Sequence, residues 1–485
     1  HPLVVTAIHG LGSVGKSTIA AALAHDEEVQ AYFSDGILWA TLGQQPNLLS
    51  LLSSWVKALG DYSFKAISVE ATSNQLRTLL CDKAVLLVVD DTWNTEDTQA
   101  FNVGGARCQV LVTTRSSGIA QALGASTYSL DVMTPSQGMV LLTKKIGRKL
   151  SNTETSDAEA LAKELGYLPL ALELAAVQVA GGKSWRILVQ EMQQEVVNLK
   201  TLDNQSTREI SDEAILKRLS LTASLNLSVQ RLPEKTRKNF IWLGILPEDV
   251  TITQTMVATL WDMDNEQDAA RELAYLHSKA LLLSGVPLPT GIPTYRLHDL
   301  FHDLARNLLT APLNPKDKGN LPGNGITLSA AHAEFLDKYR NLTDNNLWHT
   351  LPSDGYIHQH LVWHLEKADK VEEIHKLLAE ESATGGNGWY EACEKLGQTA
   401  NFVTDVTRAW QLAEDSWTET NLPKIIGLQC RYTLIITSLN SLSANLYLPA
   451  ELHIQFDSEC AKTLTSLVDK LPPDLLPPDL LLEEL

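Results

Sequence analysis

The sequence predicts a multidomain protein, in which an α/β domain with a parallel five-stranded sheet precedes a helical domain, a winged-helix domain and a second helical domain. Three observations predict this fold class. A glycine-rich loop at residues 10–18 connects an apolar stretch to an alanine-rich one. Two further apolar stretches, at 84–93 and 108–115, end in polar residues. From Thr134 onward the apolar residues recur at helical spacing.

The loop at residues 10–18 reads Gly-Leu-Gly-Ser-Val-Gly-Lys-Ser-Thr and fits the phosphate-binding pattern G-x-x-x-x-G-K-S/T. Residues 3–8 before it have the composition of a buried strand, and residues 19–24 after it favour a helix. Glycines let successive backbone N–H groups turn toward an anion, and the positive end of the following helix adds to the attraction. The alternative is an ordinary glycine-rich turn, but the strand–loop–helix order favours a nucleotide site.

In such a P-loop NTPase domain, Lys16 reaches the β- and γ-phosphates and Ser17 holds Mg²⁺. The expected cofactor is therefore ADP or ATP with Mg²⁺. The expected binding residues of the loop are Gly10, Gly12, Ser13, Val14, Gly15, Lys16, Ser17 and Thr18.

Residues 36–43 predict a second strand, followed by helices at 47–59 and 71–82. The next strand is wholly apolar and ends in Asp90 and Asp91. After a P-loop, two such carboxylates complete an NTPase site: Asp90 would hold a Mg²⁺-bound water, and Asp91 would polarise the attacking water. The alternative is a strand that ends in an Asp-rich turn.

The strand at residues 108–115 ends in Thr114 and Arg115. Ligands of open parallel sheets bind at the carboxyl ends of the strands, so Arg115 is placed to sense a γ-phosphate. Its alternative interpretation is a surface arginine. A short strand near residues 127–130 completes the sheet, and helices are expected on both of its faces.

Helical periodicity continues through residues 135–199, where Pro169 occupies a position that suits the start of a helix. Further on, helices precede a predicted hairpin that ends at Leu297, an order typical of a winged helix. His298 would by itself be a core histidine more often than a ligand, and the second pair, His302-Asp303, is expected to be structural. The predicted domains are residues 1–131 (nucleotide-binding), 132–205 (helical), 206–312 (winged helix) and 313–485 (second helical domain, with the possible start of a helical sensor repeat).

Residues 311–324 have the Pro/Gly-rich composition of a linker, and residues 326–417 are again helical. Three histidines in that helical region, His360, His364 and His375, recur at near-helical intervals. A metal cluster is conceivable there, but polar faces of helices explain these histidines better.

The net charge is −19, which argues against general binding to nucleic acid or to anionic membranes. The five cysteines contain no C-x-x-C pair, so the sequence favours a reducing cytoplasm and disfavours a zinc site. The sequence contains no apolar stretch of about 20 residues and does not open with a secretory signal. Because the loop's strand begins at once, we expect further chain before it in the natural protein.

Taken together, these residues resemble the NB-ARC family, the AP-ATPase branch of the STAND signalling NTPases, which includes plant disease-resistance proteins and prokaryotic members. The resemblance runs motif by motif over residues 3–309 and more loosely to about residue 417. Residues 33–43 look like the prokaryotic members, and 359–369 and 388–392 look like the second helical domain of the apoptotic member.

The resemblance implies roles for particular residues. Asp91 matches the catalytic base and Arg115 the first sensor. Leu168-Pro169-Leu170 matches a motif whose proline packs on adenine, and Leu297-His298-Asp299 matches one whose histidine binds the β-phosphate of ADP. The chain departs from the family where Tyr167 replaces a glycine, where Leu297 replaces a methionine, and in lacking the segment that covers adenine before the first strand.

The resemblance implies a switch in signalling or immunity that rests with ADP, exchanges it for ATP, opens and self-oligomerises, with slow ATP hydrolysis that uses Asp91, Lys16 and Arg115. An N-terminal effector, a C-terminal sensor and a trigger of unknown nature would be its partners. Two alternatives stay open: a plain turnover ATPase, and a transcription regulator that binds DNA through the winged helix. Four basic residues favour DNA binding, namely Arg231, Lys235, Arg237 and Lys238. The neighbouring helices, however, are acidic, which argues against it.

Overall fold

The computed structural model describes residues 4–10, 12, 14–203, 212–315 and 320–443. The chain divides into two units, residues His1–Phe402 and Val403–Leu485. The possible sensor repeat is expected after about Ile425, and its part beyond residue 443 lies outside the described residues, as does the binding residue Ser13. No helix of the described ranges is both long enough and apolar enough to cross a membrane.

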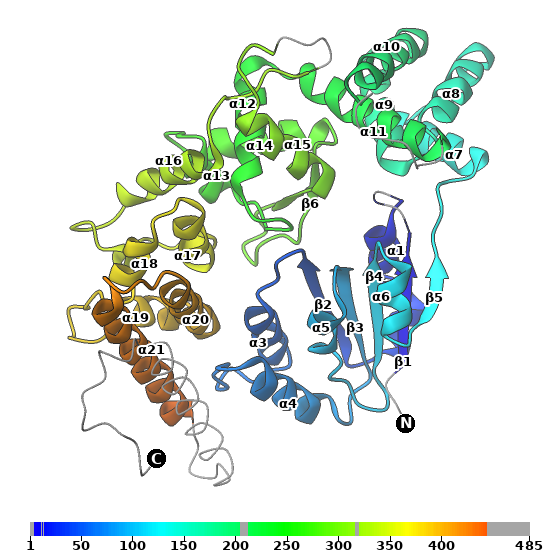
Figure 1. The fold of residues 1–485 in the computed structure, drawn as a ribbon. Coiled ribbons are helices and arrows are strands. Elements are labelled where there is room, and N and C mark those ends of the chain that lie inside the picture. Colours follow the sequence, from blue (N-terminus) through cyan, green and yellow to red (C-terminus); the bar gives the residue numbers. More distant parts are fainter. Residues whose placement is uncertain (1–3, 11, 13, 204–211, 316–319, 444–485) are drawn as a thin grey trace, which may run out of the picture. The chain divides into compact units, whose positions relative to one another are not determined.

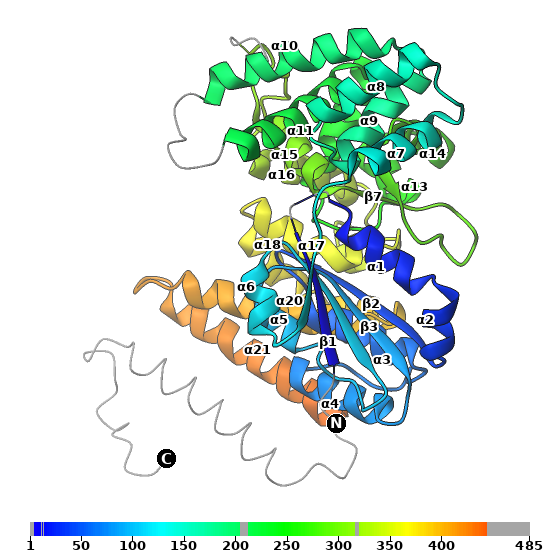
Figure 2. The same ribbon diagram turned by 90° about the vertical axis from the view of Figure 1, so that its right-hand side faces the viewer.

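The first unit begins with a five-stranded parallel sheet, as predicted (Figure 1). Its strand order is β2-β3-β4-β1-β5, so the strand that precedes the glycine-rich loop lies between β4 and β5. The strands are β1 (Val4–His9), β2 (Gly36–Gly43), β3 (Val85–Thr92), β4 (Gln109–Thr114) and β5 (Ser126–Ser129). Because all pairs are parallel, the carboxyl ends of β1, β3 and β4 meet at one edge (Figure 2).

Both faces of the sheet are buried, which explains why β3 is apolar throughout rather than alternating. Leu87 and the residues two positions before and after it in β3 pack with α3 (Leu48–Ala58) and α4 (Val69–Leu80). Leu86 and Val88 pack on the other face with Ala20 of α1 (Lys16–Ala24). The remaining helices of this domain are short: α2 (Glu27–Tyr32), α5 (Thr95–Gln99) and α6 (Ser117–Ala122).

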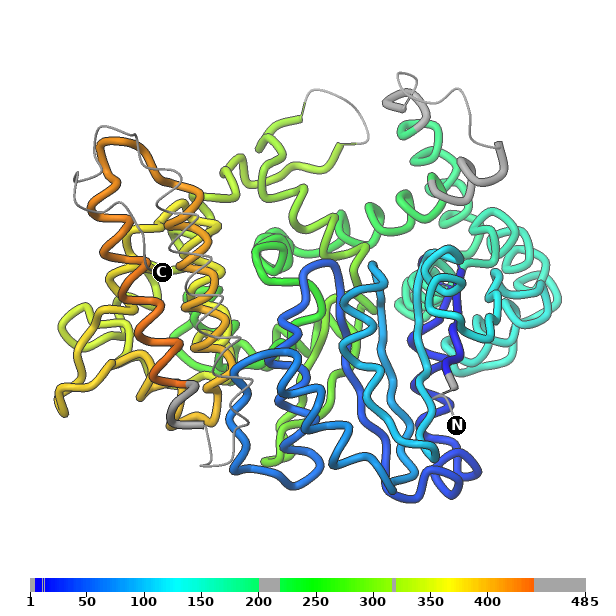
Figure 3. Tube along the Cα trace, turned by 60° about the horizontal axis from the view of Figure 1, so that its bottom comes forward, coloured from blue at the N-terminus to red at the C-terminus, as the bar shows by residue number. Residues whose placement is uncertain are grey.

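Five helices follow the sheet, and the chain can be traced through them in Figure 3. They are α7 (Pro135–Ile146), α8 (Asn152–Glu164), α9 (Pro169–Ala180), α10 (Trp185–Asp203) and α11 (Asp212–Gln230). The first two begin with capping boxes, Thr134 with Gln137 and Ser151 with Glu154. Helix α9 is apolar on every side and lies in the middle of their shared core. That core also contains Val14 of the glycine-rich loop.

The next part of the chain contains α12 (Glu234–Trp242), a 3₁₀ turn η1 (Leu243–Ile245), α13 (Gln254–Leu260), α14 (Glu266–Ser278) and α15 (Asp299–Thr310). Strands β6 (Leu282–Ser284) and β7 (Tyr295–Leu297) form the predicted antiparallel hairpin between α14 and α15. The assignment of this part as a winged helix stays a prediction.

Helix α15 packs very closely on the 3₁₀ turn at Gly244. A Cβ added to Gly244 would lie 2.3 Å from the backbone nitrogen of Arg306, so only glycine permits this approach. We expect Gly244→Ala to push α15 away and to lower stability by about 1–3 kcal/mol, the usual cost of overpacking. Gly118→Ala is the matched control, since the nearest atom there is a flexible serine hydroxyl at 3.5 Å. Thermal unfolding measures both variants, and equal midpoints would contradict the prediction.

The remaining helices are α16 (Leu328–Arg340), η2 (Trp348–Thr350), α17 (Ile357–Lys367), α18 (Val371–Leu377), α19 (Gly388–Lys395), α20 (Thr399–Asp415) and α21 (Leu422–Ser443). The expected linker binds back onto α15, because the N–H of Asn324 donates to the carbonyl of Leu308 at 2.9 Å. The polar-face explanation of the histidines is wrong for His364 and His375, which are buried. His364 lies between His332 and the hydroxyl of Tyr356, and none of the three predicted histidines belongs to a metal-ligand group among the described residues.

Candidate nucleotide-binding site

The glycine-rich loop has the geometry of a phosphate cradle. Gly15 adopts φ +98°, a left-handed conformation that glycine permits, and α1 starts directly after it. A Cβ on Gly10 would lie 2.2 Å from the carbonyl oxygen of Leu130, so this position also needs glycine. Gly12 lies beside Arg115, since a Cβ there would be 3.7 Å from the Nη1 atom of Arg115. These features let the loop turn its backbone around an anion at the start of a helix.

Lys16 is only 8% exposed, and its ammonium donates to the carbonyl of Gly10 at 3.1 Å. Burial lowers its pKa, and the charge of Arg115 lowers it further, whereas Asp91 and Asp90 oppose this shift. The neighbouring Ser17 and Thr18 are exposed in the first turn of α1. A buried cation between two acidic groups and an arginine fits a site that receives a highly charged anion.

The two carboxylates at the end of β3 have different surroundings. Asp90 is 2% exposed, accepts a hydrogen bond from the hydroxyl of Thr113 and is also hydrogen-bonded to Ser17. Burial raises the pKa of Asp90, against these hydrogen bonds. The backbone N–H of Asp91 donates to the same Thr113 hydroxyl oxygen at 2.9 Å, and the residue adopts φ +50° at a shift in the register of β3 and β4. Its carboxylate accepts a hydrogen bond from the indole N–H of Trp93 at 2.9 Å.

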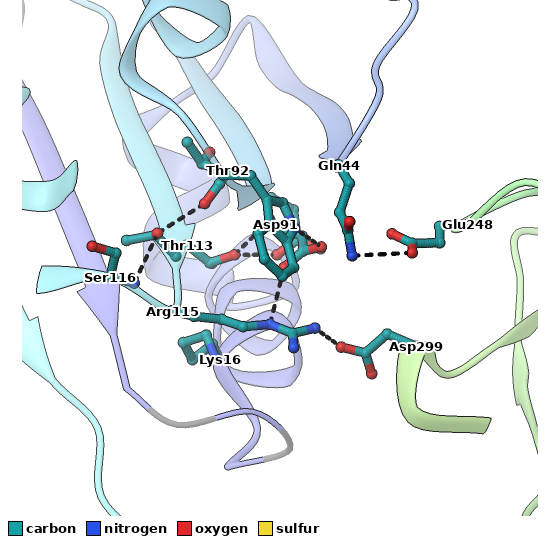
Figure 4. Close-up of polar contacts among 12 residues, drawn as sticks. Lys16, Gln44, Asp91, Thr92, Thr113, Arg115, Ser116, Glu248 and Asp299 are labelled. Atoms are coloured by element: carbon teal, nitrogen blue, oxygen red, sulfur yellow. Dashed lines mark hydrogen bonds and ion pairs between the residues drawn. The ribbon is translucent and has the colours of Figure 1, made fainter. Parts of the chain in front are cut away.

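Arg115 links the sheet to α15 (Figure 4). Its Nε lies 3.8 Å from Oδ1 of Asp91, and its guanidinium forms an ion pair with Asp299, the first residue of α15. The guanidinium also lies over the ring of Trp93, 4.8 Å from its centroid. The arginine at the end of β4 is thus held by residues that are about 200 positions apart in the sequence, and it is not a free surface side chain.

His298 precedes Asp299 as the N-cap of α15, and its Nδ1 accepts from the backbone N–H of Leu300 at 3.2 Å. The same N–H also donates to Oδ1 of Asp299 at 2.9 Å. Burial lowers the pKa of His298 to about 4, and the charges of Arg115 and Lys16 add to the effect. The imidazole is therefore neutral at pH 7 and lies within the electric field of the two cationic residues of the site.

Pro169 is half-buried at the first position of α9. Its neighbour Leu168 shares the apolar core with Val14, which connects this motif to the glycine-rich loop. Tyr167, which stands where the resembled family has a glycine, adopts φ +54°. A glycine adopts this left-handed conformation more easily, so the tyrosine is held here at a cost in backbone strain.

Sequence reasoning missed two acidic residues that follow η1, Glu248 and Asp249. The side-chain amide of Gln44, just after β2, donates to Glu248 at 3.2 Å. The carboxylate of Asp249 lies 3.3 Å from the position that a Cβ on Gly43 would occupy. Burial raises the pKa of Asp249 to about 7, and the charges of Asp91 and Asp90 raise it too. A Pro-Glu-Asp sequence looks like an ordinary turn, so only the fold reveals that it lies near Asp90 and Asp91.

The residues present fit a nucleotide with Mg²⁺. The left-handed Gly15 and the helix start suit phosphates, and buried oxygen donors of Asp90 and the hydroxyl of Ser17 are the hard ligands that Mg²⁺ prefers. Mg²⁺, when bound, neutralises charge on the phosphates.

Residues 2–152 match the model of the NB-ARC domain. The chain is 30% identical over 343 residues to the regulatory protein AfsR of Streptomyces coelicolor, covering 70% of this chain and 32% of AfsR. It is 24% identical over 390 residues to human apoptotic protease-activating factor 1, covering 76% of this chain and 28% of the factor. A disease resistance protein of Solanum bulbocastanum is 23% identical over 333 residues, covering 64% of this chain and 32% of that protein.

Among solved structures, the fold is similar to that of a Signal Transduction ATPase with Numerous Domains (STAND) protein with a tetratricopeptide repeat sensor from Pyrococcus horikoshii. The TM-score is 0.51 at 13% sequence identity, covering 96% of this chain and 59% of that one. The chain thus spans roughly a third of the length of the curated relatives it matches.

Proposed function

Because the chain carries an NB-ARC domain at residues 2–152, we propose that it is a nucleotide-dependent signalling switch: ADP holds a closed state, and exchange for ATP opens it. The observation that carries this proposal is the position of Arg115 between Asp91 and Asp299. A single guanidinium that pairs with the first turn of α15 can respond to the nucleotide and to the helix at the same time.

The switch follows from a competition for Arg115. With ADP, Arg115 stays paired with Asp299 and holds α15 at the edge of the sheet. With ATP, the γ-phosphate offers Arg115 more negative charge than one carboxylate, so Arg115 leaves Asp299 and α15 loses a partner. A ligand shifts an equilibrium only through a difference in its contacts with the two states, and this pair supplies such a difference.

His298 is proposed to bind the β-phosphate and so to favour the ADP state. Pro169 is proposed to pack on adenine. A nucleotide held by the loop, by Pro169 and by His298 would join three separate parts of the chain.

Slow hydrolysis is proposed to use Lys16, Asp91 and Arg115, with Ser17 and Asp90 on Mg²⁺. The carboxylate of Asp91 accepts from Trp93 and lies near Arg115.

The four-domain division, the self-oligomer in the open state, the effector, the sensor and a cytoplasmic location are parts of the same proposal. The similarity to apoptotic protease-activating factor 1 and to a disease resistance protein supports a role in signal transduction or immunity.

Nucleotide retention tests the proposal. We expect the purified chain to release fluorescent ADP slowly and His298→Ala to release it at least ~10-fold faster, because the loss of one hydrogen bond to a charged group costs about 1.5–3 kcal/mol. Unchanged release by His298→Ala would remove this role of the histidine. Steady-state hydrolysis at ~1–100 s⁻¹, typical of kinases, would favour the turnover ATPase instead, and salt-sensitive binding to duplex DNA would favour the transcription regulator.

A further inference from the structure

Three potential metal ligands meet beside the nucleotide site. Glu248 follows η1, and His302 and Asp303 lie in α15, one turn after His298. One ligand atom from each residue lies within 4.8 Å of the other two. The pair His302-Asp303, expected from the sequence to be merely structural, therefore faces a third group that comes from a distant part of the chain.

The surroundings of His302 suit a metal ligand. It is 2% exposed, and its Nε2 lies 2.7 Å from the carbonyl oxygen of Leu246. A carbonyl only accepts, so Nε2 carries a proton, and in this tautomer of the imidazole Nδ1 has the lone pair. Nδ1 is buried and has no hydrogen-bond partner among the described residues. Histidines that bind metals donate their other N–H to a backbone carbonyl in this way.

The surroundings are negatively charged. Glu248 and Asp303 approach each other, and Asp91 adds to the field, so that burial and these two charges raise the pKa of Glu248. The charge of Arg115 opposes this shift. A dication would relieve both the repulsion between the carboxylates and the unsatisfied nitrogen, which costs about 1–3 kcal/mol when left without a partner.

We propose that Glu248, His302 and Asp303 form a binding site for a divalent transition-metal cation such as Zn²⁺, distinct from the Mg²⁺ site at Ser17 and Asp90. One imidazole nitrogen and two carboxylates are a ligand set that Zn²⁺ accepts, with water in the fourth position. The bound cation fixes the 246–248 segment to α15, and through the hydrogen bond of Gln44 to Glu248 it also steadies the end of β2. This inference does not depend on the proposed function.

Metal binding by the purified, tag-free chain tests the site. After treatment with a chelator, the protein is loaded with Zn²⁺, passed through a desalting column and analysed for bound metal. Co²⁺ loading adds a visible absorption spectrum that reports a nitrogen ligand. We expect one tightly bound Zn²⁺ per chain. Asp303→Asn and His302→Gln should weaken its binding by more than the ~10–100-fold loss typical of outer-shell changes.

Two variants keep the test interpretable. Asp90→Asn removes the proposed Mg²⁺ ligand and should retain the Zn²⁺. Asp303 is exposed, so Asp303→Asn leaves the fold intact even if His302→Gln does not. Equal Zn²⁺ binding by the wild type and by Asp303→Asn would overturn the proposal, and so would the absence of bound Zn²⁺ in the wild type, which would leave a buried water as the partner of His302.

Discussion

Asp299→Asn is expected to release ADP at least ~10-fold faster than the wild type. The substitution keeps the shape of the side chain but removes the charge that pairs with Arg115. The two side chains are about a quarter to a third exposed, so the ion pair contributes more stabilising free energy than a pair in full solvent. A hydrogen bond to a charged group is worth about 1.5–3 kcal/mol, and each 1.4 kcal/mol is a factor of about ten.

Two measurements separate this effect from general destabilisation. Release of fluorescent ADP reports the nucleotide, and amide hydrogen exchange reports the opening of α15. Asp268→Asn is the matched control, because its carboxylate forms an ion pair with Arg271 of the same helix. Faster exchange throughout the chain, or ADP release equal to that of the control, would contradict a role of the Asp299–Arg115 pair in the switch.

Asp249→Asn is expected to stabilise the protein, and to do so more at high pH. The folded pKa is about 7 and the ordinary value is 3.8, so between these values the folded state binds more protons than the unfolded state. The free energy of unfolding therefore falls as pH rises through this window and levels off above pH 7. Asparagine resembles the protonated carboxyl and avoids this loss. The gain should be ~2–3 kcal/mol larger at pH 8 than at pH 5, since one pKa unit is about 1.4 kcal/mol.

Thermal unfolding at pH 5 and pH 8, without Mg²⁺, measures the gain. Glu234→Gln is the control: its side chain is exposed and pairs with Lys238, which lowers its pKa, so its removal should leave the unfolding midpoint nearly unchanged at both pH values. A gain for Asp249→Asn that does not change with pH would show that the pKa of Asp249 is not raised in the folded protein.

The parallel sheet could be predicted from the sequence because its signals are local. A strand that is apolar on both faces and ends in Asp90-Asp91 is typical of a buried parallel strand at an NTPase site. The glycines that precede Lys16 have the fixed spacing of a phosphate-binding loop. The predicted hairpin before His298 was confirmed for the same reason, since short β-prone runs flank a Pro/Gly-rich turn.

The partners across the site could not be predicted, because they depend on how distant segments pack. Nothing near Glu248 in the sequence indicates Gln44, and nothing near Arg115 indicates Asp299. The buried histidines were misjudged because a polar residue at helical spacing looks the same whether it faces solvent or a hydrogen-bonded neighbour such as Tyr356. The roles of Pro169 and Thr18 stay predictions.

The insertion of Val14 into the core of the five-helix bundle has a consequence for variation in this chain. The phosphate loop cannot adjust its backbone without disturbing Leu142 and Leu168, and repacking around these leucines reaches the loop in turn. A screen for hyperactive alleles should therefore recover conservative swaps inside this bundle, far from any charged group, alongside the expected hits in the loop itself.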